Sequence, residues 1–305
     1  MAGKTAFIFP GQGSQHIGMA KDLFDALPDA KAKFAIANDI LGFDLAHLCF
    51  EGPEEELKQT NVTQPAIFVH SCIVLEHVLA GGKKADMVAG HSLGEYTALV
   101  AAGVLSFEDA LQLVKVRGDA MQGAGLDKPG TMAAVIGLES DAVDEICRIA
   151  SSAGIVQAAN YNSPGQIVIS GDHAGIKKAI EVAQEKGARK AMELVVGGAF
   201  HSPLMEGARQ KLKLALDKTT FQDARVPIYQ NATATAETDA EAIKNNLDLQ
   251  LTNPVRWIEC VEGMITGGAS EMYELGPSKV LTGLVRRIDR SVTPTPLGTL
   301  DQLSS

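Results

Sequence analysis

The sequence predicts an α/β fold built on a parallel sheet, and three observations support this prediction. Short apolar strands alternate with helical segments along most of the chain, which is the order typical of parallel sheets. One such strand runs into the turn Gly90-His91-Ser92-Leu93-Gly94, and a helical segment follows directly. Between residues 129 and 196 the order changes to βαββαβ. We therefore predict a large α/β-hydrolase-like parallel-sheet subdomain with an inserted small ferredoxin-like subdomain.

The elements of the large subdomain are predicted from apolar periodicity and from the residues that begin and end helices. They are a strand over Lys4–Phe9, a helix from Pro65 through Leu79, a strand over Ala85–Ala89, a helix over Leu93–Ala102 and a helix from Ser106 to about Met121. Gly81-Gly82 closes the first helix, and Gly103 follows the second. Ser106-Phe107-Glu108-Asp109 resembles a capping box and marks the start of the third.

The insert is predicted from a second run of alternating elements. These are strands over Met132–Gly137, Val156–Tyr161, Gln166–Ser170 and Lys190–Val195, with helices over Asp141–Ser151 and Ala174–Lys186. Because the chain on both sides is needed to complete the larger sheet, we assign residues 1–128 and 197–305 to the large catalytic subdomain and 129–196 to the insert. A cleft between two such parts is a natural place for a substrate.

The turn Gly90–Gly94 fits the G-x-S-x-G pattern of a nucleophile elbow. A side chain at either glycine would crowd the strand or helix that must approach Ser92. Ser92 would then lie at a helix N-terminus, whose free N–H groups can stabilise an oxyanion. The alternative is a glycine-rich turn without chemistry, which the order of strand, turn and helix disfavours.

Composition and charge exclude several classes of partner. The 305-residue chain is 46% hydrophobic and carries a formal net charge of −10, which argues against nucleic acid or an anionic membrane as the main partner. The N-terminal apolar run Ala6–Pro10 is too short for a signal peptide or a membrane span, so we expect a cytoplasmic protein. The four cysteines show no metal-ligand spacing, so we expect reduced core residues and no metal.

The loop Gly11-Gln12-Gly13 imitates part of a dinucleotide-binding fingerprint. In that fingerprint the third glycine would stand at position 16, which is His16 here. We therefore expect a loop that approaches a ligand closely, but no nucleotide cofactor.

A serine nucleophile requires a base, and His201 is the candidate among seven histidines. His70 and His77 fall on the helix predicted from Pro65, and His91 points away from the cleft if Ser92 faces it. His201 follows Gly197-Gly198-Ala199-Phe200 at the second junction between the large subdomain and the insert. A single loop histidine is more often structural, but the serine elbow and the cleft position favour a catalytic base.

Arg117 falls on the apolar face of its predicted helix, together with Leu113, Val114 and Met121. A guanidinium on a core-facing stripe needs an anion, or it must extend to solvent. The anion is either an internal carboxylate or the carboxylate of a substrate, which arginine binds in a two-bond fork.

Six segments carry a resemblance to one enzyme family: Phe9-Pro10-Gly11-Gln12-Gly13-Ser14-Gln15, Gly90-His91-Ser92-Leu93-Gly94-Glu95-Tyr96, Val116-Arg117-Gly118, Asn160-Tyr161-Asn162-Ser163-Pro164, Gly198-Ala199-Phe200-His201-Ser202 and Asn253-Pro254-Val255. Together, in this order and over nearly the whole chain, they resemble the malonyl-CoA:acyl carrier protein transacylases of bacterial fatty acid synthesis. Six linked motifs are far more specific than any one of them.

The resemblance implies a ping-pong transfer. Ser92 would take the malonyl group from malonyl-CoA and then pass it to the phosphopantetheine thiol of acyl carrier protein. His201 would be the base and later the acid, and Arg117 would bind the free malonyl carboxylate. Gln12 and the backbone N–H of Leu93 would form the oxyanion hole.

The resemblance also implies that a backbone carbonyl, here that of Gln250, orients His201 in place of a carboxylate. Transfer should then fall as the pH drops through roughly 6 to 7. Phe200 before His201 implies malonyl in preference to methylmalonyl, and Asn160 and Asn162 are expected to contact the substrate. We expect a monomer with no cofactor.

Acyl carrier protein is acidic in this family's pathway, so an acidic enzyme requires a local basic patch to bind it. Two clusters are candidates, each of which is otherwise a solvated face: Lys279, Arg286, Arg287 and Arg290 near the C-terminus, and Lys177, Lys178, Arg189 and Lys190 in the insert.

Three alternatives remain open at this point. A serine esterase or thioesterase would share the elbow and the histidine but would need no arginine facing the nucleophile. The acyltransferase module of a polyketide synthase shares all the motifs but is normally embedded in a longer chain. A non-enzymatic binding protein of this fold is the third.

Overall fold

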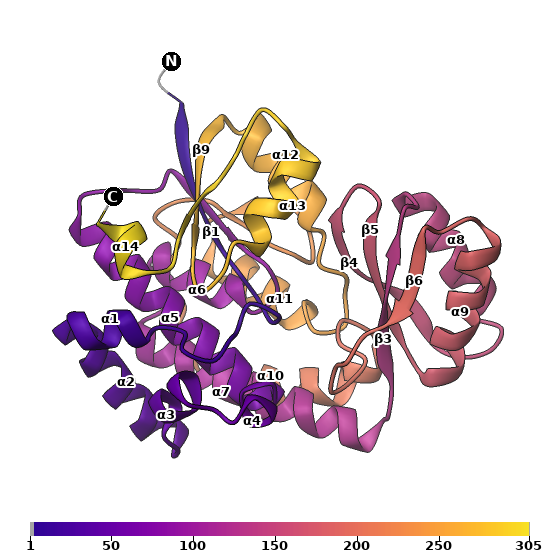
Figure 1. The fold of residues 1–305 in the computed structure, drawn as a ribbon, viewed down its shortest axis with the longest axis horizontal. Coiled ribbons are helices and arrows are strands. Elements are labelled where there is room, and N and C mark those ends of the chain that lie inside the picture. The colour runs from indigo at the N-terminus through magenta and orange to yellow at the C-terminus, as the bar shows by residue number, and fades with distance from the viewer. Residues whose placement is uncertain (1–2, 305) are drawn as a thin grey trace.

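The structure is a computed structural model that describes residues 3–304, and it contains two sheets with separate sets of helices (Figure 1). The larger sheet has six strands in the order β10-β9-β1-β2-β7-β8. Their bounds are β1 (Lys4–Phe9), β2 (Met87–Gly90), β7 (Ile228–Tyr229), β8 (Ala236–Glu237), β9 (Ala269–Leu275) and β10 (Thr295–Leu297). All neighbouring pairs are parallel except β7 with β8, which confirms the predicted parallel α/β fold.

Helices cover both faces of this sheet, so its central strand β1 is apolar and buried from Ala6 to Phe9. Ala6 and Ile8 of β1 pack on one face with residues of α12 (Trp257–Thr266) and α13 (Val280–Ile288). Phe7 and Phe9 pack on the other face with α5 (Thr60–Ala80), α6 (Gly94–Ala101) and α7 (Phe107–Asp127). Successive side chains of a strand point to opposite faces, and a parallel sheet buried on both faces therefore has a nearly continuous apolar run. Figure 1 shows α12 and α13 beside β9, with α5 and α7 below the sheet.

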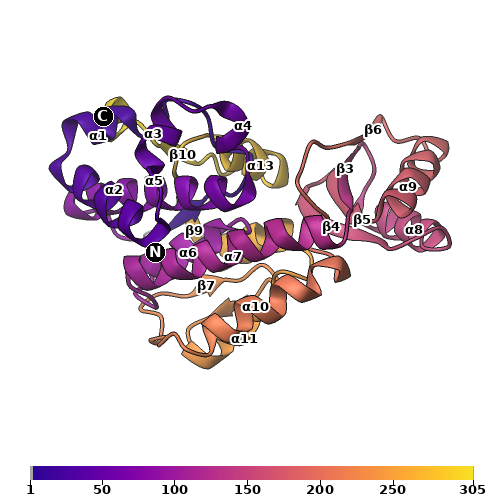
Figure 2. The ribbon, with the colours of Figure 1, turned by 90° about the horizontal axis from the view of Figure 1, so that it is seen from below.

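The helical segments of the large subdomain are α1 (Lys21–Ala26), α2 (Pro28–Leu41), α3 (Leu45–Phe50), α4 (Glu54–Leu57), α5 (Thr60–Ala80), α6 (Gly94–Ala101), α7 (Phe107–Asp127), the 3₁₀ turn η1 (Pro203–Met205), α10 (Glu206–Leu216), α11 (Ala240–Leu249), α12 (Trp257–Thr266), α13 (Val280–Ile288) and α14 (Leu300–Leu303). Seen from below, α7 runs along the large subdomain to its junction with the small one (Figure 2).

Two of the predicted helix bounds were wrong. Helix α5 begins at Thr60, and Pro65 lies inside it, because the residues just before the proline are buried and helical packing outweighs the lost hydrogen bond. Helix α7 continues to Asp127, six residues beyond the predicted end, because Ala124 still has a core to pack against. Its start is as predicted: the Ser106 Oγ accepts a hydrogen bond from the Asp109 N–H at 3.0 Å.

The small sheet is antiparallel and has the order β4-β5-β3-β6. Its elements are β3 (Thr131–Ile136), α8 (Ser140–Ala150), β4 (Val156–Ser163), β5 (Gln166–Gly171), α9 (His173–Glu185) and β6 (Lys190–Glu193). The two helices share one apolar core with the sheet. This topology confirms the predicted ferredoxin-like unit.

Helix α5 is the one helix of residues 3–304 that is long and apolar enough to cross a membrane. Its most apolar stretch is 83% buried inside the protein, which is typical of a core helix in a globular fold.

Candidate active site

The turn between β2 and α6 holds Ser92 in a strained backbone conformation. Ser92 has φ 51°, a region that residues other than glycine rarely adopt. A Cβ added at Gly90 would lie 1.9 Å from the carbonyl carbon of Gly94, and one added at Gly94 would lie 2.0 Å from the Phe9 oxygen. Both positions therefore require glycine, as the elbow pattern predicts.

Ser92 and His201 lie in direct contact. The Oγ of Ser92 is 2.8 Å from Nε2 of His201, and Nδ1 of the same ring is 2.8 Å from the backbone oxygen of Gln250. A carbonyl oxygen can only accept, so the proton of a neutral ring is on Nδ1 and Nε2 is free to accept the serine proton. This geometry suits a general base that a carbonyl orients.

Burial keeps the His201 ring neutral. The residue is 3% exposed, and desolvation lowers its pKa to about 3, with the Arg117 cation as the second cause. The expectation that transfer falls as the pH drops through roughly 6 to 7 assumed an ordinary histidine pKa, whereas burial shifts the pKa of His201 well below that range.

Arg117 lies beside the nucleophile and is 1% exposed. Its NH2 donates to the Oγ of Ser92 and to Oε1 of Gln250, both at 2.9 Å, and its NH1 donates to Oε1 of Gln64 at 2.8 Å. The buried Nε has no partner. Burial lowers the pKa of this guanidinium, and the charges of Tyr96 and Glu95 oppose that shift.

Arg117 neither extends to solvent nor forms an ion pair. The ion pairs found within residues 3–304 do not include it. Its hydrogen-bond partners are neutral amide and hydroxyl oxygens, which orient the guanidinium without neutralising it. Of the alternatives that the sequence left open, a substrate anion fits this arrangement best.

Ser92, His201 and Arg117 line a cavity of about 190 Å³. The other predicted site residues on its wall are Gln12, Leu93, Asn160, Asn162 and Phe200. The side chains of Met121, Met132 and Val168 add apolar surface. Leu93 is the N-cap of α6, where backbone N–H groups have no partner within the helix. The structure thus brings all nine predicted site residues to one place.

Asn162 does more than line the cavity. Its Oδ1 is 2.8 Å from Nε2 of His91, whose ring tilts against Trp257. His91, which follows β2, is therefore hydrogen-bonded to Asn162 of β4 in the small subdomain. His91 serves as a structural bridge across the cleft, whereas His201 contacts the nucleophile.

Several residues of the site were not predicted. Gln64 holds Arg117, Asn231 holds the backbone of Ser92, and Gln157 donates from its Nε2 to the backbone oxygens of His201 (2.8 Å) and Thr252 (3.2 Å). A polar residue within the apolar run of α5 was a usable signal for Gln64. Gln157 and Asn231 carried no such signal.

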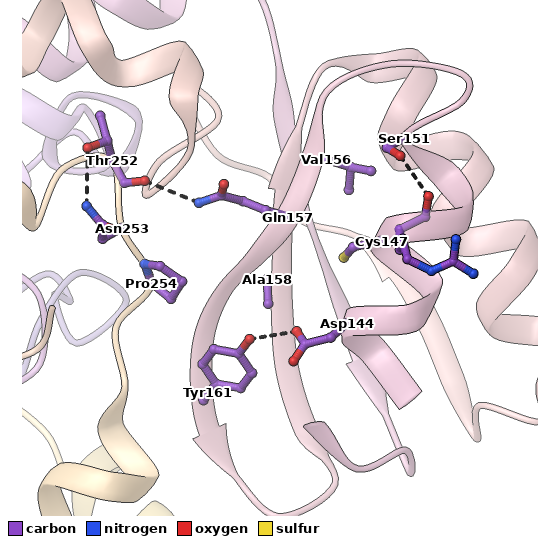
Figure 3. A pocket seen from close by; sticks show the side chains of 11 residues that line it. Asp144, Cys147, Ser151, Val156, Gln157, Ala158, Tyr161, Thr252, Asn253 and Pro254 are labelled. Atoms are coloured by element: carbon purple, nitrogen blue, oxygen red, sulfur yellow. Dashed lines mark hydrogen bonds between the residues drawn. The ribbon is translucent and has the colours of Figure 1, made fainter. Parts of the chain in front are cut away.

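A larger groove of about 320 Å³ lies between α8, β4 and the segment Thr252–Pro254 (Figure 3). Gln157 points across it toward Thr252, and Tyr161 donates to Asp144 at 2.6 Å. Neither Ser92 nor His201 lines this groove. The smaller cavity, which holds the nucleophile and base, is therefore the candidate active site.

Nothing among residues 3–304 resembles a metal centre. No group of three or more His, Cys, Asp or Glu side chains is arranged there to hold a metal ion. Cys49, Cys72, Cys147 and Cys260 are buried and unpaired, as the sequence predicted for reduced core residues.

Comparisons with known proteins agree with this site. Residues 6–297 match the family model of the acyl transferase domain. A malonyl CoA-acyl carrier protein transacylase of Bacillus subtilis is 46% identical over 288 residues, which is 94% of this chain and 91% of that protein. Among solved structures, this chain superposes on the malonyl-CoA:acyl carrier protein transacylase of Xanthomonas oryzae with a TM-score of 0.95 at 42% sequence identity. The superposition covers 100% of this chain and 97% of that one.

A further solved structure is a malonyl-transacylase in complex with a type II PKS acyl-carrier protein. It matches with a TM-score of 0.95 at 40% identity, over 99% of this chain and 98% of that one. The resemblance found in the six motifs is confirmed over the full length: the chain belongs to the malonyl-CoA:acyl carrier protein transacylase family of acyl transferases.

Proposed function

We propose that this protein transfers the malonyl group of malonyl-CoA to the phosphopantetheine thiol of acyl carrier protein through a malonyl-Ser92 intermediate. The observation that carries the proposal is the position of Arg117. A buried cation without an ion-pair partner donates a hydrogen bond to the nucleophilic oxygen itself. An acyl group that ends in a carboxylate would supply the missing anion at the right place.

In the first half-reaction, Nε2 of His201 takes the proton of Ser92 as Oγ attacks the thioester carbon. The N–H of Leu93, at the start of α6, and Gln12 on the facing loop would stabilise the oxyanion. Collapse of the tetrahedral intermediate breaks the C–S bond. The CoA thiolate leaves with the proton held by His201, and the malonyl ester remains on Ser92.

The second half-reaction runs the same steps in reverse with a different thiol. His201 takes the proton of the phosphopantetheine thiol, whose sulfur attacks the malonyl ester. Ser92 leaves with that proton, and the enzyme returns to its starting state. Both half-reactions start from the neutral imidazole, which is the form that burial favours.

Arg117 would hold the malonyl carboxylate in both half-reactions. Its NH1 and NH2 already have neutral partners, and its Nε has none. A malonyl carboxylate that replaces one of these neutral partners would accept two hydrogen bonds from the guanidinium in a fork. Phe200 and Met132 on the cavity wall would limit the size of the acyl group to malonyl.

The proposal includes no cofactor and no metal, since serine, histidine and arginine supply each step. It places the protein in the cytoplasm as a monomer that supplies extender units for fatty acid synthesis. Malonyl-CoA and acyl carrier protein are its two substrates.

A single assay separates transfer from hydrolysis. The protein is incubated with malonyl-CoA, with and without holo-acyl carrier protein, and the products are separated by mass. Transfer predicts malonyl-acyl carrier protein and free CoA, with little malonate. Free malonate at the same rate with or without carrier protein would instead identify a thioesterase.

A further inference from the structure

The backbone of the nucleophile is held by one asparagine side chain from a distant part of the chain. The Oδ1 of Asn231 accepts a hydrogen bond from the N–H of Ser92 at 2.7 Å, and its Nδ2 donates to the oxygen of Gly90 at 2.7 Å. Asn231 follows β7 and is 0% exposed. One buried amide therefore pairs with the Ser92 N–H and the Gly90 oxygen, which are the backbone groups on either side of His91.

The strain at Ser92 explains why such a contact matters. A non-glycine residue at φ 51° is stable only where the surrounding structure enforces it. In this conformation the N–H of Ser92 is directed into the protein, where an unpaired donor is costly. The amide of Asn231 thus stabilises the same backbone geometry that aims Oγ at His201.

A buried carboxylate lies behind this asparagine. Glu95, in the first turn of α6, is 0% exposed. Its Oε2 accepts from the backbone N–H of Asn231 at 2.8 Å, and its Oε1 accepts from Nε2 of Gln230 at 3.2 Å. Burial raises the pKa of this carboxyl to about 7. None of the proposed chemical steps uses Glu95, so its burial needs another explanation.

Gln250 completes the arrangement from the other side. Its Nε2 donates to the backbone oxygen of Ser92 at 3.0 Å and to Oδ1 of Asn231 at 3.4 Å. The N–H and the oxygen of Ser92 are both held by buried amide side chains. Rotation about the Cα–Cβ bond of Ser92, which moves Oγ, is then the main freedom that the nucleophile retains.

We propose that Asn231 is a positioning residue for the nucleophile, and that Glu95 holds Asn231 in place. The inference rests on the proposed function insofar as Ser92 is the nucleophile. Its effect should be on the reactivity of Ser92 and not on the affinity for malonyl-CoA, because neither side chain lines the substrate cavity.

The test measures the reactivity of Ser92 with phenylmethylsulfonyl fluoride, a small probe that needs neither Arg117 nor carrier protein. The serine oxygen displaces fluoride, His201 takes the proton, and intact mass spectrometry follows the adduct. Asn231→Ala should slow labelling at least about tenfold, because a buried donor and acceptor lose their partners. The kcat for malonyl transfer should fall by a similar factor, while KM for malonyl-CoA stays within about twofold.

Glu95→Gln should slow labelling of Ser92 several-fold. Because glutamine keeps the size of the side chain, this variant should fold and tests the inference even if Asn231→Ala does not fold. Added to Asn231→Ala, it should slow labelling no further, because Glu95 acts on Ser92 through the Asn231 amide. A merely structural role would instead give losses that multiply.

Glu274→Gln is the matched control. Glu274 is also 0% exposed, and it accepts from the backbone N–H groups of Leu281 and Thr282, away from Ser92. It should label within about twofold of the unmodified protein. Equal losses in Glu95→Gln and Glu274→Gln, or labelling of Asn231→Ala within twofold of normal, would overturn the inference. Labelling of Ser92 without malonyl transfer would contradict the proposed function alone.

Discussion

The guanidinium of Arg117 donates a hydrogen bond to Oγ of Ser92 across 2.9 Å, so the cation that would select the substrate also touches the nucleophile. Gln64 and Gln250 hold it from the other side, at 2.8 and 2.9 Å. In the proposed function, substrate selection and nucleophile orientation would therefore meet in one side chain. A substitution at Arg117 should affect both, and the experiment must separate them.

Arg117→Ala should reduce malonyl transfer at least tenfold. Removal of one partner from a buried hydrogen-bonded charge pair costs about 2–5 kcal/mol, which corresponds to one to four powers of ten. Acetyl-CoA has no carboxylate and should lose much less. The ratio of malonyl to acetyl turnover is the quantity to measure, because it cancels general damage to the site. An unchanged ratio would show that the arginine is structural.

Arg117→Lys should restore only part of this ratio. An ammonium keeps the charge but lacks the planar fork that binds a carboxylate at two points. Complete restoration would mean that charge alone selects malonyl, and the fork geometry would then have no part in recognition.

The rate of malonyl transfer should not depend on protonation of His201 between pH 8 and pH 5. The folded protein keeps this ring neutral, with its pKa lowered from the ordinary value to about 3 by burial and by Arg117. The base is lost only as the pH falls toward that value. The kcat/KM for malonyl-CoA should therefore form a plateau over this range in Glu95→Gln, which lacks the buried carboxyl whose pKa is raised to about 7, measured in short assays that precede acid unfolding. A decline centred between pH 6 and 7 in this variant would place an exposed histidine in the mechanism.

His201→Ala should lose transfer by about two to four powers of ten, which is the usual contribution of a positioned general base. The initial rate of CoA release from malonyl-CoA measures this step without carrier protein. A rate within tenfold of normal would remove His201 from the mechanism.

The basic cluster near the C-terminus is the better candidate for binding the carrier protein. Arg286 and Arg287 lie in the last turn of α13, and Arg287 donates a hydrogen bond to Gln166 of β5, so this cluster lies where the two subdomains meet. Lys177 and Lys178 lie on α9, at the outer end of the small subdomain (Figure 1).

Arg286→Glu combined with Arg290→Glu should raise KM for carrier protein about threefold or more and leave KM for malonyl-CoA unchanged. Arg287 is left intact because of its bond to Gln166. Lys177→Glu with Lys178→Glu is the matched control of equal charge change and should have no such effect. If neither pair changes KM for carrier protein, the docking prediction is wrong for both clusters.

The sequence predicted those parts of the protein that local chemistry determines. The elbow follows from two glycines that permit close approach, and the insert follows from strands and helices that each form a local pattern. Arg117 was conspicuous as a charge on an apolar stripe. His201 was favoured by its loop at the junction of the two subdomains. Gln250 was found because the motifs resemble a known family, since no local pattern pairs a histidine with a carbonyl 49 residues away.

The parts that the sequence did not predict depend on contacts between distant segments. Asn231 is 139 residues from Ser92 along the chain, and nothing near it indicates that its amide meets the elbow. Gln157 likewise meets His201 only through the placement of β4 beside the loop. Helix α5 begins before Pro65 because tertiary packing outweighs the local preference against proline.

Peptide mass mapping after incubation with malonyl-CoA alone tests the central claim most directly. The account predicts one malonyl group per chain, located on the peptide that contains Ser92, and its removal when holo-acyl carrier protein is added. Ser92→Ala should fold normally, since a small side chain contributes little to packing, and should carry no malonyl group. A malonyl adduct retained by Ser92→Ala, or located on another peptide of the unmodified protein, would contradict the account.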